Sequence, residues 1–160
     1  MKNELIKILR ENARLPLEEI ASRLSAEPVA VAAAMDELEK EGVICGYTVV
    51  LNEAMLPDAA VKALIEVKIT PRREGGFDSA ARRIAKFPEV TDLILVSGSF
   101  DLLLTVTGRS LQEVANFVAA KLATIDGVLS TSTGFMLRKY KESGKIMQDD
   151  EDYERLKVCF

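Results

Sequence analysis

The stretch from Leu17 to Tyr47 constrains the fold of this chain more than any other. It reads as two short helices separated by a tight break, followed by Gly42-Val43-Ile44-Cys45-Gly46-Tyr47, which leads away as a strand. Proline is tolerated at the first turn of a helix, where Pro16 and Pro28 stand, and glycine is favoured just beyond a helix end, where Gly42 stands. This order predicts a helix-turn-helix, a motif whose second helix normally lies in the major groove of DNA.

The helix that would read DNA, about Pro28 to Glu41, is poor in the side chains that do so. Positions 30, 32, 33 and 34 are alanine, and between positions 27 and 41 there are five acidic residues and one base, Lys40. An alanine methyl contacts the methyl group of thymine but cannot donate a hydrogen bond to guanine. Because cations supply most non-specific affinity, DNA binding here is expected to be weak and to depend on flanking cations such as Arg14 and Arg23. The alternative is a helix that packs on protein, or whose alanines only favour helix formation.

A small core is expected beneath these helices. A further helix is predicted from Lys2 to Asn12, since Leu5, Ile8 and Leu9 keep helical spacing. The expected inward positions of the other two helices are Ile20, Ala21, Leu24, Val31, Met35 and Leu38. Three helices that share one core make residues 1–46 a helix-turn-helix domain.

Composition excludes several classes of protein. The 160 residues are 48% hydrophobic and 29% charged, and the net charge of -4 gives no overall attraction to nucleic acid. The absence of histidine excludes Ser-His and Cys-His catalysis and His-containing zinc sites. No apolar run approaches the roughly 18 residues of a membrane helix, and the N-terminus begins an amphipathic helix and not a signal peptide. We expect a cytoplasmic protein with reduced Cys45 and Cys159, no membrane partner, no metal, no cofactor and no enzymatic activity.

Periodicity changes from helical to strand-like in the second half of the chain. A strand at Tyr47–Leu51 and a linker containing Pro57 together span residues 47–59. Beyond them, apolar and polar residues alternate from Val61 to Ile69, as in a strand with one buried face. The later predicted elements are a helix at Phe77–Phe87, strands at Val90–Ser97 and Phe100–Thr107 around a Gly98-Ser99 turn, a helix at Ser110–Ile125 and a strand at Val128–Arg138.

This β-α-β-β-α-β order predicts an α+β protein whose second domain, residues 60–141, is a ferredoxin-like αβ-sandwich. Helices cover one face of such an antiparallel sheet and leave the other free. The free face would carry either Leu129, Thr131, Thr133, Phe135 and Leu137 or the alternate residues of that strand. We judge both sets too apolar for water and expect a partner sheet. Residues 142–160 form an acidic extension, either solvated or an interaction tail, with a further strand at Leu156–Phe160.

Several short motifs occur together in the order and spacing of one family. They are Asn12-Ala13-Arg14, Glu19-Ile20-Ala21, the run from Leu38 to Tyr47, Val96-Ser97-Gly98-Ser99-Phe100-Asp101-Leu102, Gly127-Val128, Thr131-Ser132-Thr133 and Tyr140-Lys141. Through them the chain resembles the Lrp/AsnC family of feast/famine transcriptional regulators over nearly its whole length. Each motif alone is weak, but together they are specific.

The resemblance implies a regulator that binds double-stranded DNA through its N-terminal domain and an amino acid or related small effector between C-terminal domains. It also implies homodimers formed through the sheets, which often assemble further into octamers. The positions that match the family's DNA-contacting helix, with the flanking cations, are Arg14, Arg23, Glu27, Pro28, Val29, Ala30, Ala33, Ala34 and Glu37. Family members often carry Ser or Thr and then Arg or Lys there, whereas this chain carries alanine and acid, so the expected DNA binding is weak.

The effector-binding residues expected from the resemblance are Gly98, Ser99, Phe100, Asp101, Thr131 and Thr133. Backbone N–H groups near Gly98 would hold a carboxylate, and Asp101 would pair with an ammonium group. The alternative is a plain turn ended by an aspartate, with the two threonines as strand formers on a half-buried face.

Two other functions stay open. An acidic, alanine-rich helix also suits an amino-acid-sensing or oligomerisation protein that has lost DNA affinity and modulates partner regulators. Siroheme decarboxylase resembles the architecture of this family, so the fold alone does not exclude an enzyme. That enzyme family relies on histidine, however, and this chain has none.

Overall fold

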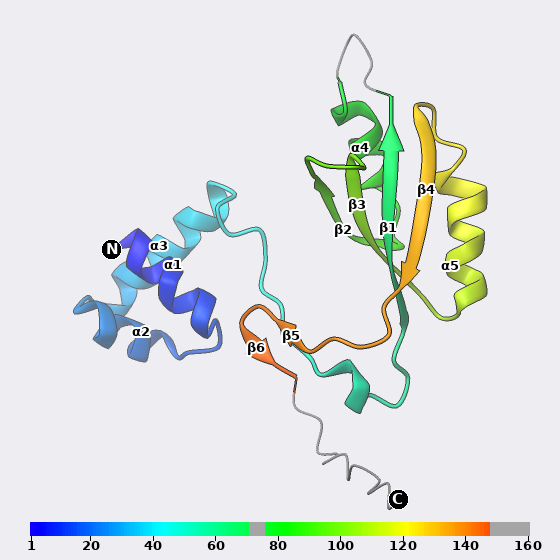
Figure 1. Ribbon diagram of the computed structural model, residues 1–160. Helices are drawn as coiled ribbons and strands as arrows, with labels where there is room; N and C mark the ends of the chain where they lie inside the picture. Colours follow the sequence, from blue (N-terminus) through cyan, green and yellow to red (C-terminus); the bar gives the residue numbers. More distant parts are fainter. Residues whose placement is uncertain (71–75, 148–160) are drawn as a thin grey trace, which may run out of the picture. The chain divides into compact units, whose positions relative to one another are not determined.

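A computed structural model of the chain describes residues 1–70 and 76–147 (Figure 1). The chain divides into two compact units, Met1–Val50 and Leu51–Phe160, and each unit has a hydrophobic core of its own. The strand predicted at Leu156–Phe160 lies outside the described residues, as does most of the acidic extension.

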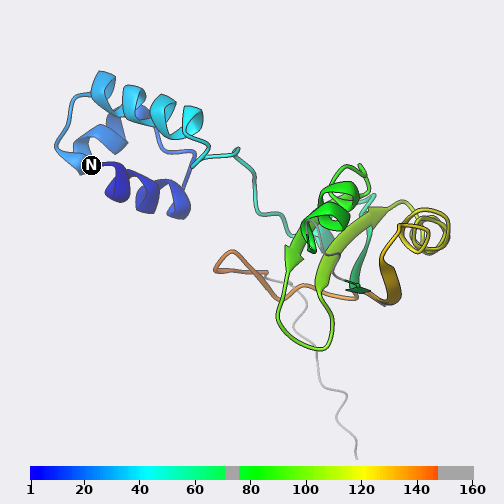
Figure 2. The same cartoon turned by 90° about the horizontal axis from the view of Figure 1, so that it is seen from above.

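The N-terminal unit consists of three helices, α1 (Lys2–Glu11), α2 (Leu17–Leu24) and α3 (Pro28–Lys40), seen together in Figure 1 and Figure 2. Their buried residues form one core, made of Leu5, Leu9, Ile20, Ala21, Val31, Ala34 and Leu38. Full burial of one large aliphatic side chain contributes roughly 1.5–3 kcal/mol. Because isolated helices this short are marginal in water, the shared core holds them together. The three-helix prediction is confirmed.

Tight turns fix how α3 begins and ends. Ser25 adopts a left-handed conformation with a φ of 49°, and Ala26 donates its N–H to the Ala21 carbonyl at 3.0 Å. At the other end Gly42 has a φ of 71°, and Val43 donates to the Leu38 carbonyl at 2.9 Å. Gly42 therefore ends α3 as predicted, because glycine adopts positive φ without a steric penalty.

The strand predicted at Tyr47–Leu51 does not form. Residues 44–52 pair with no strand among the described residues, and the side chains of Tyr47 and Val49 are exposed. Alternating apolar residues indicate which face a strand would bury. A strand also needs a neighbour that pairs its N–H and C=O groups, and that requirement cannot be read from the segment itself.

The C-terminal unit is a four-stranded antiparallel sheet with two helices, in the predicted order. Its elements are β1 (Val61–Ile69), α4 (Asp78–Ile84), β2 (Val90–Leu95), β3 (Leu102–Gly108), α5 (Leu111–Phe117) and β4 (Val128–Phe135). A 3₁₀ turn, η1 (Glu53–Met55), precedes β1, and α5 continues into a π-helical turn, η2 (Val118–Leu122). The strand order β2-β3-β1-β4 confirms the ferredoxin-like fold.

The two helices cover the same face of this sheet. The inner residues of β1 pack in one cluster with Ile84 of α4 and with Val114 and Phe117 of α5. Ser110 caps α5, since its hydroxyl oxygen accepts the N–H of Glu113 at 3.1 Å, as the predicted capping box requires. No described element of this unit covers the other face of the sheet.

The residues of β4 that lie on the open face are not the apolar ones. Thr131 and Thr133 pair with Val67 and Ile65 of β1, whose side chains are in the core, so both threonines lie on the helix-covered face. The alternate residues on the open face are Ser130, Ser132 and Gly134. The expectation that both sets are too apolar for water is therefore wrong for β4. The apolar residues on this face come from neighbouring strands instead, with Leu64 of β1 exposed by 40% and Ile94 of β2 by 53%.

A small hairpin follows β4 where the acidic extension was expected to begin. Its strands are β5 (Lys141–Glu142) and β6 (Lys145–Ile146). Ser143 and Gly144 both have positive φ, 46° and 80°, as two-residue hairpin turns require. No helix of the described residues is long and apolar enough to cross a membrane.

Candidate functional sites

The first candidate site is the exposed face of α3. Val29 is 80% exposed, and Ala30, Ala33 and Glu37 are exposed with it. Ala34 is only 4% exposed and belongs to the helical core, so its assignment as a DNA-contacting residue is wrong. Ala34 lies three residues after Val31 and four before Leu38, on the same inward stripe.

At the N-terminal end of α3, Pro28 is half-buried and Glu27 is exposed. Glu27 accepts the N–H groups of Ala30 and Val31 with its backbone carbonyl, and its side chain makes no capping bond. These two residues therefore flank the exposed face, and the side chains that determine its chemistry are the exposed alanines and Val29.

Lys2 of α1 offsets part of the acidity of this helix. Its ammonium lies 3.1 Å from a carboxylate oxygen of Glu37 and 2.8 Å from one of Glu41. The hydrogen bond to Glu41, followed by that to Glu37, raises the pKa of Lys2 above its usual value. Glu37 is thus held in a contact within the unit, and its carboxylate would repel DNA phosphates less than an unpaired one.

The two cations expected to contact DNA lie on the surface of the same unit. Arg23 forms a 2.6 Å ion pair with Glu19, one turn earlier on α2. Arg14 is exposed in the turn before α2, where its backbone N–H donates to the Asn12 side chain at 3.0 Å. Exposed ion pairs are worth only about 0–1 kcal/mol, so a phosphate can compete with Glu19 for Arg23.

The segment after α3 is tied to that helix by Tyr47, a contact the sequence did not reveal. The Tyr47 hydroxyl donates a hydrogen bond to Glu39 at 2.8 Å. Burial first, and then this bond, raise the pKa of Tyr47. The contact joins residues eight positions apart, so no local pattern predicts it.

The second candidate site is the connection between β2 and β3. The predicted Gly98-Ser99 two-residue turn is wrong, because the strands end at Leu95 and restart at Leu102. Residues 96–101 form a longer loop, closed by a 2.9 Å hydrogen bond from the Val96 N–H to the Asp101 carbonyl. Gly98 and Ser99 are exposed on it, Phe100 is half-buried, and a Cβ at Gly98 would meet no atom within 4 Å.

Asp101 anchors this loop to the sheet. One of its carboxylate oxygens accepts the Ile69 N–H at 2.8 Å, and its own N–H donates to the Val67 carbonyl at 3.0 Å. The Ile69 N–H stands at the end of β1, beyond the last residue that pairs with β3. The carboxylate therefore has a structural role in addition to any role toward a ligand.

The threonines of the expected effector site lie across the sheet from this loop. Thr131 of β4 pairs with Val67 of β1, which pairs in turn with Leu102 of β3. Two residues farther along β4, Thr133 pairs with Ile65, which pairs with Leu104. β1 separates them from the loop, so the described chain does not bring all six predicted residues around one cavity. Among the described residues there is also no cluster of acidic or Cys side chains fit for a metal ion.

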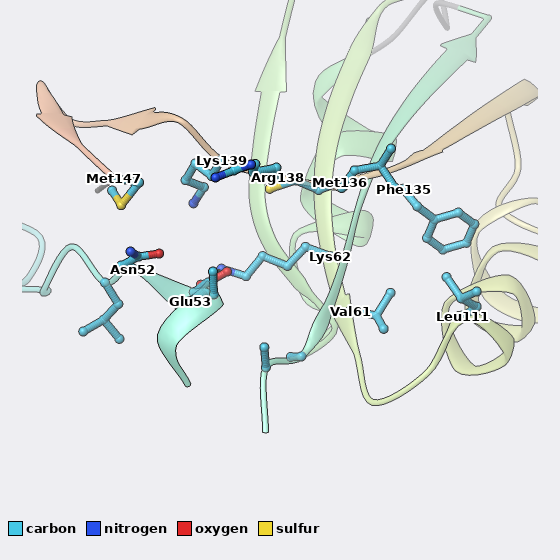
Figure 3. Close-up of a pocket in the computed structure, with 15 residues that line it drawn as sticks. Asn52, Glu53, Val61, Lys62, Leu111, Phe135, Met136, Arg138, Lys139 and Met147 are labelled. Atoms are coloured by element: carbon cyan, nitrogen blue, oxygen red, sulfur yellow. The ribbon is translucent and has the colours of Figure 1, made fainter. Parts of the chain in front are cut away.

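A pocket of about 310 Å³ lies elsewhere in the C-terminal unit (Figure 3). Its walls come from residues 51–54 and 59–62, from Leu111 at the start of α5, from residues 135–139 at the end of β4 and beyond it, and from Met147. The pocket assembles from four separate segments and contains no motif, so no sequence pattern reveals it.

Comparisons with known proteins cover both units. Residues 2–44 match the family described as winged helix-turn-helix DNA-binding, and residues 62–146 match the Lrp/AsnC ligand binding domain. The chain is 41% identical over 158 residues to an uncharacterized HTH-type transcriptional regulator, YugG, of Bacillus subtilis. This alignment covers 98% of this chain and 95% of YugG. It is 28% identical to the HTH-type transcriptional regulator LrpA of Pyrococcus horikoshii, over 86% of this chain and 94% of that protein.

Solved structures share the fold. The crystal structure of MtbAldR has a TM-score of 0.73 at 23% identity, covering 88% of this chain and 94% of that one. A transcriptional regulator from Neisseria meningitidis, solved as a complex with L-Met, has a TM-score of 0.66 at 24% identity, covering 88% and 90%. With both units matched in order and a 41% identical relative across almost its full length, the chain belongs to the Lrp/AsnC family of helix-turn-helix transcriptional regulators.

Proposed function

We propose that this regulator contacts DNA directly but weakly, with the exposed face of α3 and with flanking cations. The observation that carries this proposal is the position of Ala30, Ala33 and Val29, which stand on the exposed face of the second helix of a helix-turn-helix. Small side chains allow close approach to DNA and contact with thymine methyls. Phosphate contacts would come from Arg14 and Arg23.

An electrophoretic shift with the DNA upstream of the protein's own gene tests this proposal. Binding is expected at low salt and should weaken steeply as salt increases, because released counterions supply most of the affinity. No shift at micromolar protein and low salt would contradict direct DNA binding. It would favour the alternative, an amino-acid-sensing or oligomerisation protein that modulates partner regulators, for which the acidic residues of α3 are the support.

We further propose that an amino acid binds at the loop 96–101, with its carboxylate near the N–H groups of Gly98 and Ser99 and its ammonium near Asp101. Exposure of this loop and the open space above Gly98 support the proposal. So does the L-Met complex of the Neisseria meningitidis regulator, which has the same fold. The second oxygen of Asp101 would face the ligand while the first keeps its bond to Ile69.

Calorimetry with wild type and Asp101→Asn separates the two roles of Asp101. Asparagine keeps an acceptor for the Ile69 N–H but loses the negative charge that an ammonium requires. Amino-acid binding should fall at least about tenfold while the fold is preserved. Undiminished binding by Asp101→Asn would remove Asp101 from the effector site.

We also propose that homodimers form through the open faces of two sheets, and that they assemble further into octamers. Leu64 and Ile94 give this face exposed apolar surface, which soluble proteins usually cover. Sedimentation of Leu64→Lys compared with Ala119→Lys, at an exposed position of η2 on the helical side of the unit, tests the face. Equal association of the two variants would contradict it.

A further inference from the structure

We propose that Glu66 and Lys68 make the open face of the sheet, the one opposite α4 and α5, complementary to a second copy of this chain. The two charges would then select an identical partner in preference to a related chain with other residues there. This inference rests on the homodimer proposed above and adds what chooses the partner. Both residues belong to β1, which lies between β3 and β4, so they are not on an edge strand.

Glu66 and Lys68 are exposed and have no partner within the described chain. The residues next to them along β1 are buried in the core, and side chains alternate between faces along a strand, which places both on the open face. Neither side chain forms an ion pair or a hydrogen bond with a described residue. Lys62, earlier on the same face, differs because it pairs with Glu53. An acid and a base two positions apart thus remain free to pair with another chain.

The strand on one side of this pair leaves space for long side chains. In the register of β4 with β1, Ser132 pairs with Glu66 and Ser130 pairs with Lys68. Both serines are exposed, and Gly134 follows them on the same face. Sheets that pack face to face lie about 10 Å apart. A glutamate and a lysine from opposite sheets can meet across that gap where their neighbours are this small.

Apolar side chains lie on the other side of the pair. Leu103 of β3 pairs with Glu66 and with Ile94 of β2, and Ile94 is 53% exposed. A second sheet that covers this apolar surface also removes water from the neighbouring charges. Charges that lose their water are costly unless each meets an opposite charge. The pair would therefore act mainly against wrong partners, whatever net affinity it adds.

A two-fold interface would form this ion pair twice. In such an interface, residue i of one copy contacts residue j of the other, and j of the first contacts i of the second. Glu66 would meet Lys68 of the partner subunit, and Lys68 would meet Glu66 of the partner subunit, with the two β1 strands antiparallel. A related chain with another charge at either position would leave unpaired or like charges at these contacts.

Asp92 is a second carboxylate of the open face and provides a control. It pairs with Thr105 of β3, which pairs with Leu64 of β1, so it lies on the same face. Its strand, β2, is at the edge of the sheet. The Thr91 hydroxyl also donates a hydrogen bond to Asp92 at 3.0 Å. The same change of charge at Asp92 thus alters the face without altering the proposed contact.

Sedimentation of full-length charge-reversal variants over a range of concentrations tests the pairing. Glu66→Lys alone and Lys68→Glu alone should each weaken the homodimer at least about tenfold, because like charges then meet at both contacts. The double variant with both changes should associate as wild type does. Arg82→Glu, an exposed position of α4, should also leave association unchanged.

Mixing the single variants gives the sharper result. With one variant fluorescently labelled, Glu66→Lys and Lys68→Glu should form a mixed dimer about as tight as the wild-type dimer, because opposite charges meet at both contacts again. Asp92→Lys mixed with Lys68→Glu should gain no such affinity. Recovery with Asp92→Lys, or no recovery with Glu66→Lys while wild type associates, would overturn the proposal. A wild type that stays monomeric, or Leu64→Lys that associates as wild type does, would contradict the homodimer itself and this inference with it.

Discussion

The two faces of α3 carry the same residue type for opposite reasons. Ala34 is buried against the N-terminal core, where a small side chain lets the helices approach each other. Ala33, its neighbour in sequence, is exposed on the face that a helix-turn-helix turns toward DNA. The inner face preserves the fold of a regulator while the outer face has few groups that read bases. Fold and recognition chemistry are therefore separable within one helix.

Ala34→Arg, on the inner face of α3, is expected to have the largest effect. The substitution places a long, charged side chain in a packed core with no partner, which should destabilise the N-terminal unit by more than about 3 kcal/mol. Urea unfolding followed by circular dichroism measures this loss. Ala33→Arg, one residue earlier, should remain within about 0.5 kcal/mol of wild type. Similar losses at both positions would show that α3 is not oriented as described.

Removing the Asp101 carboxylate should have the next largest effect. Asp101→Ala leaves the Ile69 N–H without its acceptor, which should lower the free energy of unfolding by about 1–3 kcal/mol. Asp101→Asn keeps an acceptor and should lose less. Thermal unfolding of the two variants distinguishes a lost hydrogen bond from a lost charge, and equal melting temperatures would contradict the anchoring role.

The contact between Glu89 and Lys121 predicts a pH dependence in the C-terminal unit. The hydrogen bond from Lys121 lowers the pKa of Glu89 below its ordinary value of 4.5. Because the folded-state pKa is lower, the pair stabilises the fold above about pH 4.5, and this contribution is lost as pH falls through the folded pKa. Glu89→Gln should thus be less stable than wild type near about pH 7 and nearly equal to it near about pH 3. A difference that does not change with pH would contradict this.

Lys2→Met should have the smallest effect, since its ion pairs with Glu37 and Glu41 are at the surface. Lys7→Met removes an exposed cation from the same helix and serves as the matched control. Unfolding at low salt should show a greater loss for Lys2→Met, and about 1 M salt should abolish the difference. A difference that persists in salt would mean that Lys2 acts through packing.

Features set by local spacing were predictable from the sequence. Gly42 marked the end of α3, Ser110 capped α5, and the order of strands and helices identified the ferredoxin-like unit. The burial of Ala34 was also predictable, because positions 31, 34 and 38 follow helical periodicity as well as positions 31, 35 and 38 do. The structure buries Ala34 and leaves Met35 half-buried.

Features that depend on distant segments were not predictable. The hydrogen bond from Ile69 to Asp101 joins residues 32 positions apart, and the pocket forms only where four segments converge. The prediction of a strand at 47–51 was wrong because alternating apolar residues indicate a buried face but do not show whether a neighbouring strand is available for pairing. Local patterns thus predicted the scaffold, whereas the contacts around the candidate sites required the fold.

The DNA affinity of Ala33→Arg tests directly whether the exposed face of α3 contacts DNA. Fluorescence anisotropy on one duplex, over a series of salt concentrations, should compare it with wild type and with Ala119→Arg, which adds the same charge at an exposed position of the C-terminal unit. Of the two variants, only Ala33→Arg should bind DNA non-specifically more tightly than wild type. Its log affinity should depend on log salt more steeply by about 0.9, the value for one added phosphate contact. If Ala33→Arg and Ala119→Arg bind alike, the exposed face of α3 does not face DNA.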